Sequence, residues 1–130
     1  MRVLGIDVGT SRTGIAISDP LGITCTPLPV IRERDGQKVL LRIVAVAEEN
    51  GAEEIVVGLP RPLGGGTNEQ MDAVLAFKER LAALAAVPVT TWDERFTSKL
   101  AESGRQRAGE HDSVAACYML QDYLDWRSRG

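Results

Sequence analysis

Acidic side chains are the residues of this sequence best suited to chemistry. Asp7 lies within an apolar segment near the N-terminus, and Asp112 begins the last helical pattern. Asp93 and Glu94 follow another apolar segment between them. A carboxylate among buried apolar neighbours is costly unless it is paired or binds a metal. Carboxylates without histidine or cysteine suit a hard cation such as Mg²⁺ or Mn²⁺, and two such ions can promote cleavage of a phosphodiester.

Each of these acids also has an ordinary explanation. Asp7 could accept hydrogen bonds within the turn at 9–12, as an Asx-type residue. The segment 93–95 could be a solvated loop with a surface ion pair, and Asp112 could cap the N-terminus of its helix. His111, the only histidine in the sequence, is expected at the surface, and it excludes a metal site built from several histidines of one chain.

Small residues around Asp7 leave room for a ligand. Gly5 and Gly9 would share its face of the strand, because side chains alternate along a strand. Arginine matches phosphate through paired hydrogen bonds. The stretch 95–107 carries four basic residues against one acidic residue, a local excess of three positive charges. The candidates to bind nucleic-acid phosphates are Thr10, Arg12, Arg61, Arg95 and Lys99.

The elements that must position these residues follow a definite order. Three apolar segments joined by short turns predict an antiparallel meander, and Pro27 and Pro29 place the third strand at an edge. Alternating helical and apolar patterns then predict helices and buried strands. The sequence Thr67-x-x-Gln70 predicts a capping box. The predicted strands are 2–8, 13–18, 23–31, 54–59 and 87–92, and the predicted helices are 37–50, 67–85, 96–103 and 112–126.

This order predicts an α/β fold with a mixed five-stranded sheet flanked by helices. The first strand would be central, and the fourth and fifth would run parallel to it. Open α/β sheets place their sites at the carboxyl ends of such strands. Asp7 and the pair Asp93–Glu94 lie at two of these ends, and Asp112 is in line with the packing face of the last helix. Three acidic positions could therefore meet at one edge of the sheet.

Length and composition limit the classes of protein. A chain of 130 residues is expected to be one domain, 1–130. A net charge of −3 argues against a general nucleic-acid binder, which is usually basic. No apolar run is long enough to span a membrane and no signal peptide is evident, so we expect a cytoplasmic protein. Cys25 and Cys117 lack metal-ligand spacing and are expected to be buried free thiols.

Several motifs resemble the YqgF (RuvX-like) family, and they follow the family's order over nearly the whole chain. The motifs are Gly5-Ile-Asp-Val-Gly-Thr10, Gly14-Ile-Ala-Ile-Ser-Asp-Pro-Leu-Gly-Ile23, Val56-Val-Gly-Leu-Pro60, Asp93-Glu-Arg95 and the segment 111–124, which opens with His-Asp-Ser-Val-Ala-Ala. The resemblance implies a ribonuclease H-like fold. It also implies either a Holliday junction resolvase or a nuclease that processes the 5′ end of pre-16S ribosomal RNA.

The resemblance also implies roles for single residues. Asp7, Glu94 and Asp112 match the family's acids and would be both metal ligands and catalytic residues, with Asp93 as the alternative to Glu94. The implied cofactor is Mg²⁺ or Mn²⁺, with two ions, and the implied partner is branched DNA or precursor rRNA. A resolvase that cuts a four-way junction symmetrically should act as a homodimer. The segment 96–111 is shorter than is usual in the family, and its basic residues are mostly arginines.

Two other functions compete with the nuclease. A non-catalytic nucleic-acid-binding or ribosome-assembly module could keep the same fold, although retention of all three acids argues against lost catalysis. The first strand and turn also resemble the phosphate-binding hairpin of sugar kinases and actin-like ATPases. Those proteins need two such domains around a nucleotide, and this chain has room for one.

Overall fold

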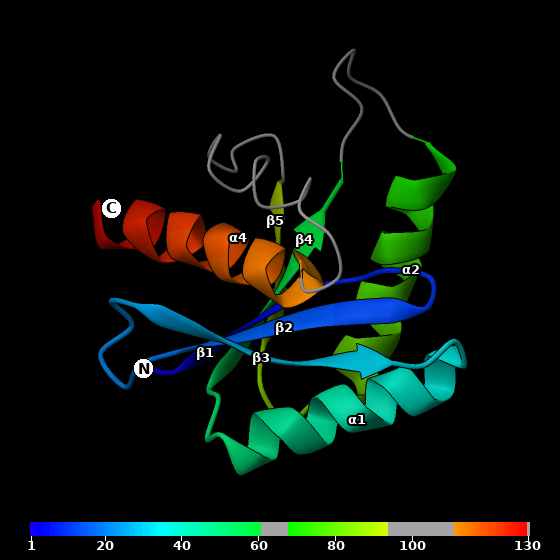
Figure 1. The fold of residues 1–130 in the computed structure, drawn as a ribbon, viewed down its shortest axis with the longest axis horizontal. Helices are drawn as coiled ribbons and strands as arrows, with labels where there is room; N and C mark the ends of the chain where they lie inside the picture. The colour runs from blue at the N-terminus through cyan, green and yellow to red at the C-terminus, as the bar shows by residue number, and fades with distance from the viewer. Residues whose placement is uncertain (61–67, 94–110, 130) are drawn as a thin grey trace.

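The fold is described from a computed structural model, which places residues 1–60, 68–93 and 111–129, with only the backbone of His111 and Asp112. Within these ranges the chain forms five strands and three helices (Figure 1). None of the helices there has the length and apolar character needed to span a membrane. The elements are β1 (Val3–Asp7), β2 (Arg12–Ser18), β3 (Cys25–Arg32), α1 (Gly36–Glu49), β4 (Glu54–Leu59), α2 (Glu69–Leu84), β5 (Val89–Asp93) and α4 (His111–Arg129).

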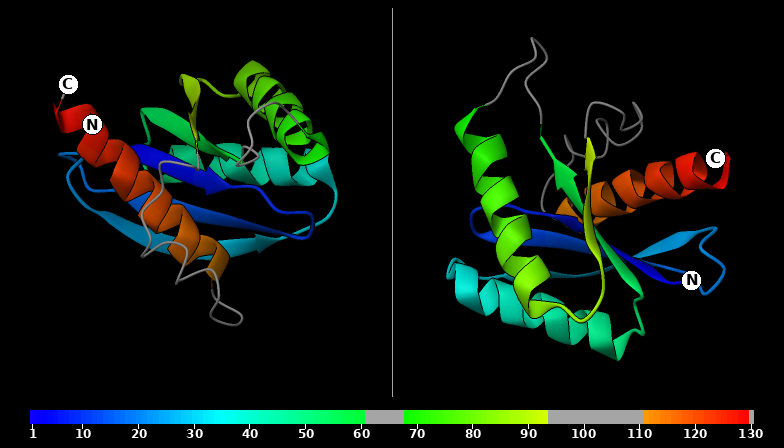
Figure 2. Two further views of the ribbon diagram at one scale, coloured as in Figure 1. Left: turned by 90° about the horizontal axis from the view of Figure 1, so that it is seen from above. Right: turned by 180° about the vertical axis from the view of Figure 1, so that it is seen from behind.

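The strands form one mixed sheet in the order β3-β2-β1-β4-β5. β1, β2 and β3 pair antiparallel, whereas β4 and β5 run parallel to β1. The predicted α/β class, central first strand and parallel fourth and fifth strands are therefore confirmed. β3 lies at one edge, as its two prolines predicted. Helices α1 and α2 cover one face of the sheet and α4 covers the other (Figure 2).

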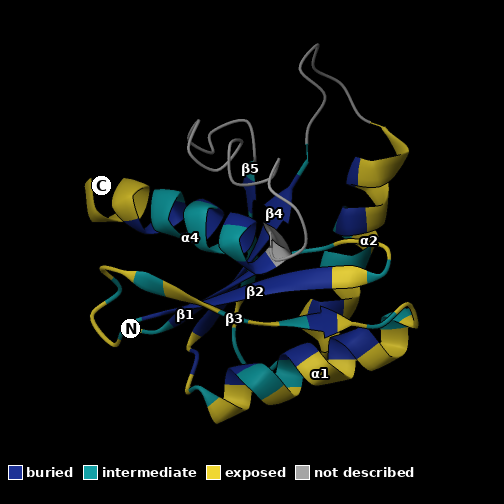
Figure 3. Ribbon diagram, viewed as in Figure 1, coloured by how far each residue is buried: buried dark blue, intermediate teal, exposed yellow. Residues whose placement is uncertain are grey.

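Each face of the sheet has its own apolar cluster. Leu4 and Ile6 of β1 are fully buried against the residues of α1 and α2, whereas Val3 belongs to the cluster beneath α4. Every residue of β4 is buried, as expected for a strand covered on both faces. The central strands form the buried middle of the molecule (Figure 3). The alternation along β1 thus assigns Gly5 and Asp7 to the α4 face.

Two local predictions differ from the structure. The N-cap of α2 is Asn68, whose side chain accepts a hydrogen bond from the Met71 amide at 2.8 Å, so the capping box predicted from Thr67 is wrong. Asparagine satisfies the same otherwise unpaired amides through its side-chain carbonyl. α4 begins at His111, which places Asp112 inside the first turn rather than at the cap. The predicted helix 96–103 lies outside the described residues.

The two cysteines are free thiols, as predicted, but they are half-buried rather than buried. Their Sγ atoms lie 2.8 Å apart, between β3 and α4. The Cys117 carbonyl oxygen, 3.0 Å from the Cys25 sulfur, is a second acceptor for the single hydrogen of this thiol. Donation from Cys25 stabilises a thiolate on Cys117, so the pKa of Cys117 is lowered and that of Cys25 is raised. The pair joins an edge strand to the helix that covers it.

Candidate active site

Asp7 is the last residue of β1 and lies half-buried on the face covered by α4. Its partner on β2 is Gly14. On the other side, Ile6 pairs with Val57, so the next position along β4, beside Asp7, is Gly58. Glycine inside a strand often marks a place where another group approaches closely. Asp7 is thus flanked on both neighbouring strands by residues without a side chain. Gly14 and Gly58 were not among the predicted site residues, although this rule could have identified them.

Gly5 lets α4 approach the sheet beneath the site. A Cβ atom at Gly5 would lie 2.9 Å from the Cβ of Leu120, a separation that real Cβ atoms do not tolerate. Leu120 is fully buried in the cluster beneath α4. The position of α4 over β1 therefore depends on the absence of a side chain at Gly5.

Replacing Gly5 by alanine is expected to push α4 away from β1. Overpacking of a filled core costs about 1–3 kcal/mol. The measurement is urea denaturation followed by circular dichroism. Gly36→Ala is the control, because a Cβ there would meet only the end of the flexible Arg80 side chain. Equal stability of Gly5→Ala and the wild type would show that α4 does not pack this closely.

The first turn of α4 is anchored beside Asp7. Ser113 is buried, and its Oγ accepts a hydrogen bond from the Ile15 amide at 3.2 Å. The pairing of β2 with β3 is irregular between Thr13 and Ile15, at the position where this bond to the helix forms. Ile15 follows Gly14, the partner of Asp7. The backbone of Asp112, the neighbour of Ser113, therefore lies on the side of the sheet where β1 ends. Ser113 was not predicted, because a serine inside a helix gives no signal of its partner.

The end of β5 bears on the choice between Asp93 and Glu94. Trp92 belongs to the cluster beneath α4, on the same face as Asp7. Strand alternation assigns Asp93, the last residue of β5, to the opposite face. Glu94 lies outside the described residues, and so do Arg61, Arg95 and Lys99. The described residues include no group of three acidic, histidine or cysteine side chains placed to share a metal ion.

The turn after β1 supplies the described candidates for phosphate binding. Gly9, Thr10, Ser11 and Arg12 line a shallow cavity of about 330 Å³, and both Thr10 and Arg12 are exposed. A Cβ at Gly9 would overlap the carbonyl oxygen of Arg12, so the turn requires glycine there. The tight turn holds an exposed guanidinium close to the end of β1. An anion near Asp7 could therefore be bound from this side.

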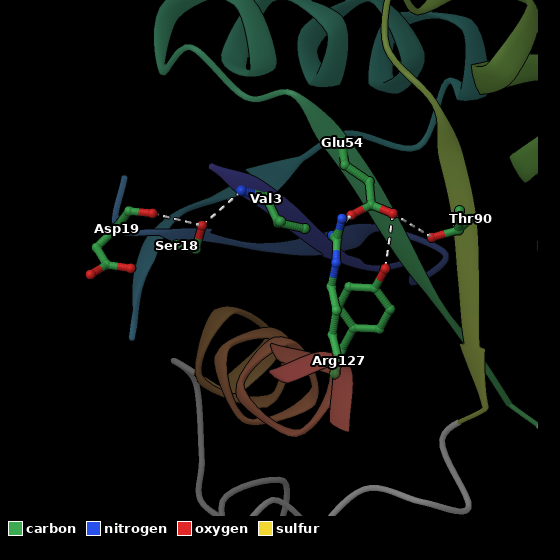
Figure 4. Close-up of polar contacts among 7 residues, drawn as sticks. Val3, Ser18, Asp19, Glu54, Thr90 and Arg127 are labelled. Atoms are coloured by element: carbon green, nitrogen blue, oxygen red, sulfur yellow. Dashed lines mark hydrogen bonds and ion pairs between the residues drawn. The ribbon is translucent and has the colours of Figure 1, made fainter. Parts of the chain in front are cut away.

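A second polar group lies at the other end of β4, and sequence reasoning missed it. Glu54 is 8% exposed and forms an ion pair with Arg127. It also accepts hydrogen bonds from Tyr123 Oη at 2.9 Å and Thr90 Oγ1 at 3.5 Å (Figure 4). Glu54 is at the start of β4, whereas Asp7 is at the end of the parallel strand β1. The network therefore fastens α4 to the sheet and lies away from the candidate site.

This network raises the pKa of the Tyr123 phenol, first through burial and then through the hydrogen bond to Glu54. We expect Tyr123 to titrate above its ordinary value of about 10, as measured by ultraviolet absorbance. Glu54→Gln should move the pKa of Tyr123 back toward that value. Because the neutral phenol is favoured in the fold, its contribution to stability is complete below about pH 10 and is lost as pH rises through the raised pKa. An unchanged titration in Glu54→Gln would contradict the described hydrogen bond.

Comparison with known proteins gives a consistent result. A family model for RuvX, described as Holliday junction resolvase, matches residues 1–126. A protein of Moorella thermoacetica named "Putative pre-16S rRNA nuclease" is 43% identical, over 96% of this chain and 95% of its own length.

The fold has counterparts among solved structures. Thermus thermophilus RuvC in complex with a Holliday junction substrate matches with a TM-score of 0.67 and 17% identity, over 99% of this chain and 96% of that one. Fowlpox virus resolvase with substrate Holliday junction DNA matches with a TM-score of 0.62 and 9% identity, over 98% of this chain and 99% of that one. At these identities the likeness concerns the fold alone, and it confirms the expected ribonuclease H-like architecture.

Proposed function

The chain belongs to the RuvX family, and from this premise we propose that it is a divalent-metal-dependent endonuclease acting on the 5′ end of precursor 16S rRNA. The observation that carries the proposal is the placement of Asp7. It is a half-buried carboxylate between two glycine positions, at the edge where the first turn of α4 brings the backbone of Asp112. The names of relatives with 35–43% identity support a nuclease of precursor rRNA.

The donor set fits a hard cation. Asp7, Glu94 and Asp112 would hold the metal through carboxylate oxygens, and Glu94 is preferred to Asp93 because Asp93 belongs to the opposite face of β5. Mg²⁺ or Mn²⁺, when bound, supplies an activated water and stabilises the leaving oxygen.

The chain itself positions the substrate. The glycines around Asp7 leave space for the sugar-phosphate backbone to approach, and Arg12 would hold a phosphate next to the one cleaved. Thr10, Arg61, Arg95 and Lys99 would add further phosphate ligands. A protein with this function would work in the cytoplasm, where a bacterial precursor rRNA is found.

The resolvase description of the family favours a second candidate, symmetric cleavage of four-way junction DNA. Such a reaction needs two active sites, so this candidate requires a homodimer. Processing of an rRNA end has no such requirement. Sedimentation of the protein with and without junction DNA would test that requirement.

The test is cleavage of labelled precursor rRNA and junction DNA side by side, with Mg²⁺, Mn²⁺ or EDTA. We expect discrete cleavage of the rRNA with either metal and none in EDTA. Preferential cleavage of the junction would select the second candidate. Binding without cleavage under every condition would overturn both and support a non-catalytic module.

A further inference from the structure

A groove between α4 and β5 has no role in the site described above. It has a volume of about 390 Å³ and is lined by Trp92, Asp122, Trp126 and Arg129. The last three recur at positions i, i+4 and i+7 of α4, and therefore form one stripe along the helix. The volume is at the lower end of the range for small-molecule sites.

Trp126 is the unusual residue of this groove. It is 58% exposed, although large aromatic side chains are mostly buried. Its ring lies 5.4 Å from that of Trp92 and 6.0 Å from that of Tyr123, measured between centroids, with interplanar angles of 53° and 36°. Tyr123 is held in turn by Glu54. The indole of Trp126 is thus supported by two rings that are themselves fixed, while more than half of its surface remains in water.

The groove continues the face that carries the candidate active site. Trp92 pairs with Gly58, and Gly58 is the position beside Asp7, so the backbones of Trp92 and Asp7 are two strand spacings apart, or about 10 Å. Trp126 lies 14 residues beyond Asp112 on α4, or about 21 Å along the helix. A nucleic-acid strand leaving the site along this face would reach the groove within a few nucleotides.

We propose that this groove binds an unpaired nucleobase of the substrate, which stacks on the exposed indole of Trp126. The inference rests on the proposed function. Stacking on an aromatic side chain is available to every base, but only when the base is free of a duplex. The groove would therefore select substrates with single-stranded nucleotides beside the cleaved bond.

The charges along the groove agree with such a ligand. Arg129 is exposed and supplies a guanidinium that can bind a phosphate. Asp122 lies about two turns before it on the same stripe. In the proposed complex, the phosphate of the bound nucleotide lies beside Arg129, at one end of the groove. The base of the same nucleotide stacks on Trp126.

The two tryptophans of the chain both line this groove, so intrinsic fluorescence reports on it directly. The probe is a 12-nucleotide oligoadenylate, titrated in EDTA so that no metal-dependent cleavage occurs. We expect the oligonucleotide to quench the fluorescence, and an RNA duplex of the same length to do so much less. Equal quenching by both, or none by either, would overturn the proposal.

Variants separate stacking from a merely structural role. Trp126→Leu keeps an apolar side chain and should weaken oligoadenylate binding by about fivefold or more, measured by fluorescence anisotropy of the labelled oligonucleotide. Trp126→Phe should retain most of the affinity, because a phenyl ring can stack. Arg129→Gln should make the binding constant less dependent on salt concentration, by the amount expected for the loss of about one phosphate contact. Leu84→Ala, which removes a 45% exposed leucine on α2, should change nothing.

Two further outcomes are decisive. If Trp126→Leu leaves oligonucleotide binding unchanged but alters self-association in sedimentation, the groove is an interface between copies and the proposal is wrong. Because the titration needs neither metal nor cleavage, its result is independent of the proposed nuclease activity. Quenching without any cleavage in Mg²⁺ or Mn²⁺ would contradict the proposed function and leave the base-binding groove in place.

Discussion

Asp7→Asn should reduce cleavage of precursor rRNA by about a hundredfold or more while leaving the fold intact. The amide has the same shape as the carboxylate but carries no negative charge, so it would be a poor ligand for a divalent cation. Losing several kcal/mol of transition-state stabilisation corresponds to at least two orders of magnitude in rate. Single-turnover cleavage of labelled rRNA measures this loss without interference from product release.

The control for Asp7→Asn is Asp72→Asn. Asp72 is an exposed acid in the first turn of α2, on the other side of the sheet. It undergoes the same chemical change and should keep the wild-type rate. Thermal unfolding of both variants checks that the fold survives. Cleavage by Asp7→Asn at the wild-type rate would remove this carboxylate from the reaction.

Leu120→Ala is expected to have the largest effect on stability. The side chain is fully buried between α4 and the sheet, and its Cβ lies directly against Gly5. Removing a buried leucine costs about 2–5 kcal/mol, because the cavity left behind collapses only partly. Against the 5–15 kcal/mol typical of whole domains, this is a large share of the total. Urea denaturation measures this loss of unfolding free energy. The slope of the unfolding free energy against urea concentration should stay at the wild-type value.

The position of Leu120 also connects stability to the site. α4 carries Asp112 near Asp7, so loosening the helix should lower cleavage as well as stability. Leu41→Ala on α1 is the matched control, because Leu41 is 53% exposed and its loss should cost less than about 0.5 kcal/mol. Leucine-to-alanine changes of equal cost at both positions would show that α4 is not docked as described.

Much of the fold could be predicted because the sequence patterns are local. The alternation of apolar residues along β1 assigned Asp7 to one face, and the packing of Leu4 and Ile6 on the opposite face confirms it. The continuous apolar run at 54–59 predicted a strand covered on both faces, with the bounds that the structure has. The order of elements then determined the order of strands, because right-handed crossovers leave few alternatives.

The residues that were missed depend on partners far away in the sequence. Glu54 opens the predicted strand 54–59, but its partners Tyr123 and Arg127 are 69 and 73 positions away. The bond from Ile15 to Ser113 spans 98 positions. No periodicity encodes such pairs, because they arise only after α4 has docked. The same reason explains why the sulfur atoms of Cys25 and Cys117 lie side by side without any motif that predicts it.

The proposed function requires that Asp7 and Asp112 help to hold one divalent metal site. It is tested most directly by Mn²⁺ binding, followed by electron paramagnetic resonance, for the wild type, Asp7→Asn, Asp112→Asn and Asp72→Asn. We predict that Asp7→Asn and Asp112→Asn each bind Mn²⁺ at least about tenfold more weakly than the wild type. Asp72→Asn should bind Mn²⁺ like the wild type. Indistinguishable Mn²⁺ binding by all four proteins would show that neither Asp7 nor Asp112 holds the metal.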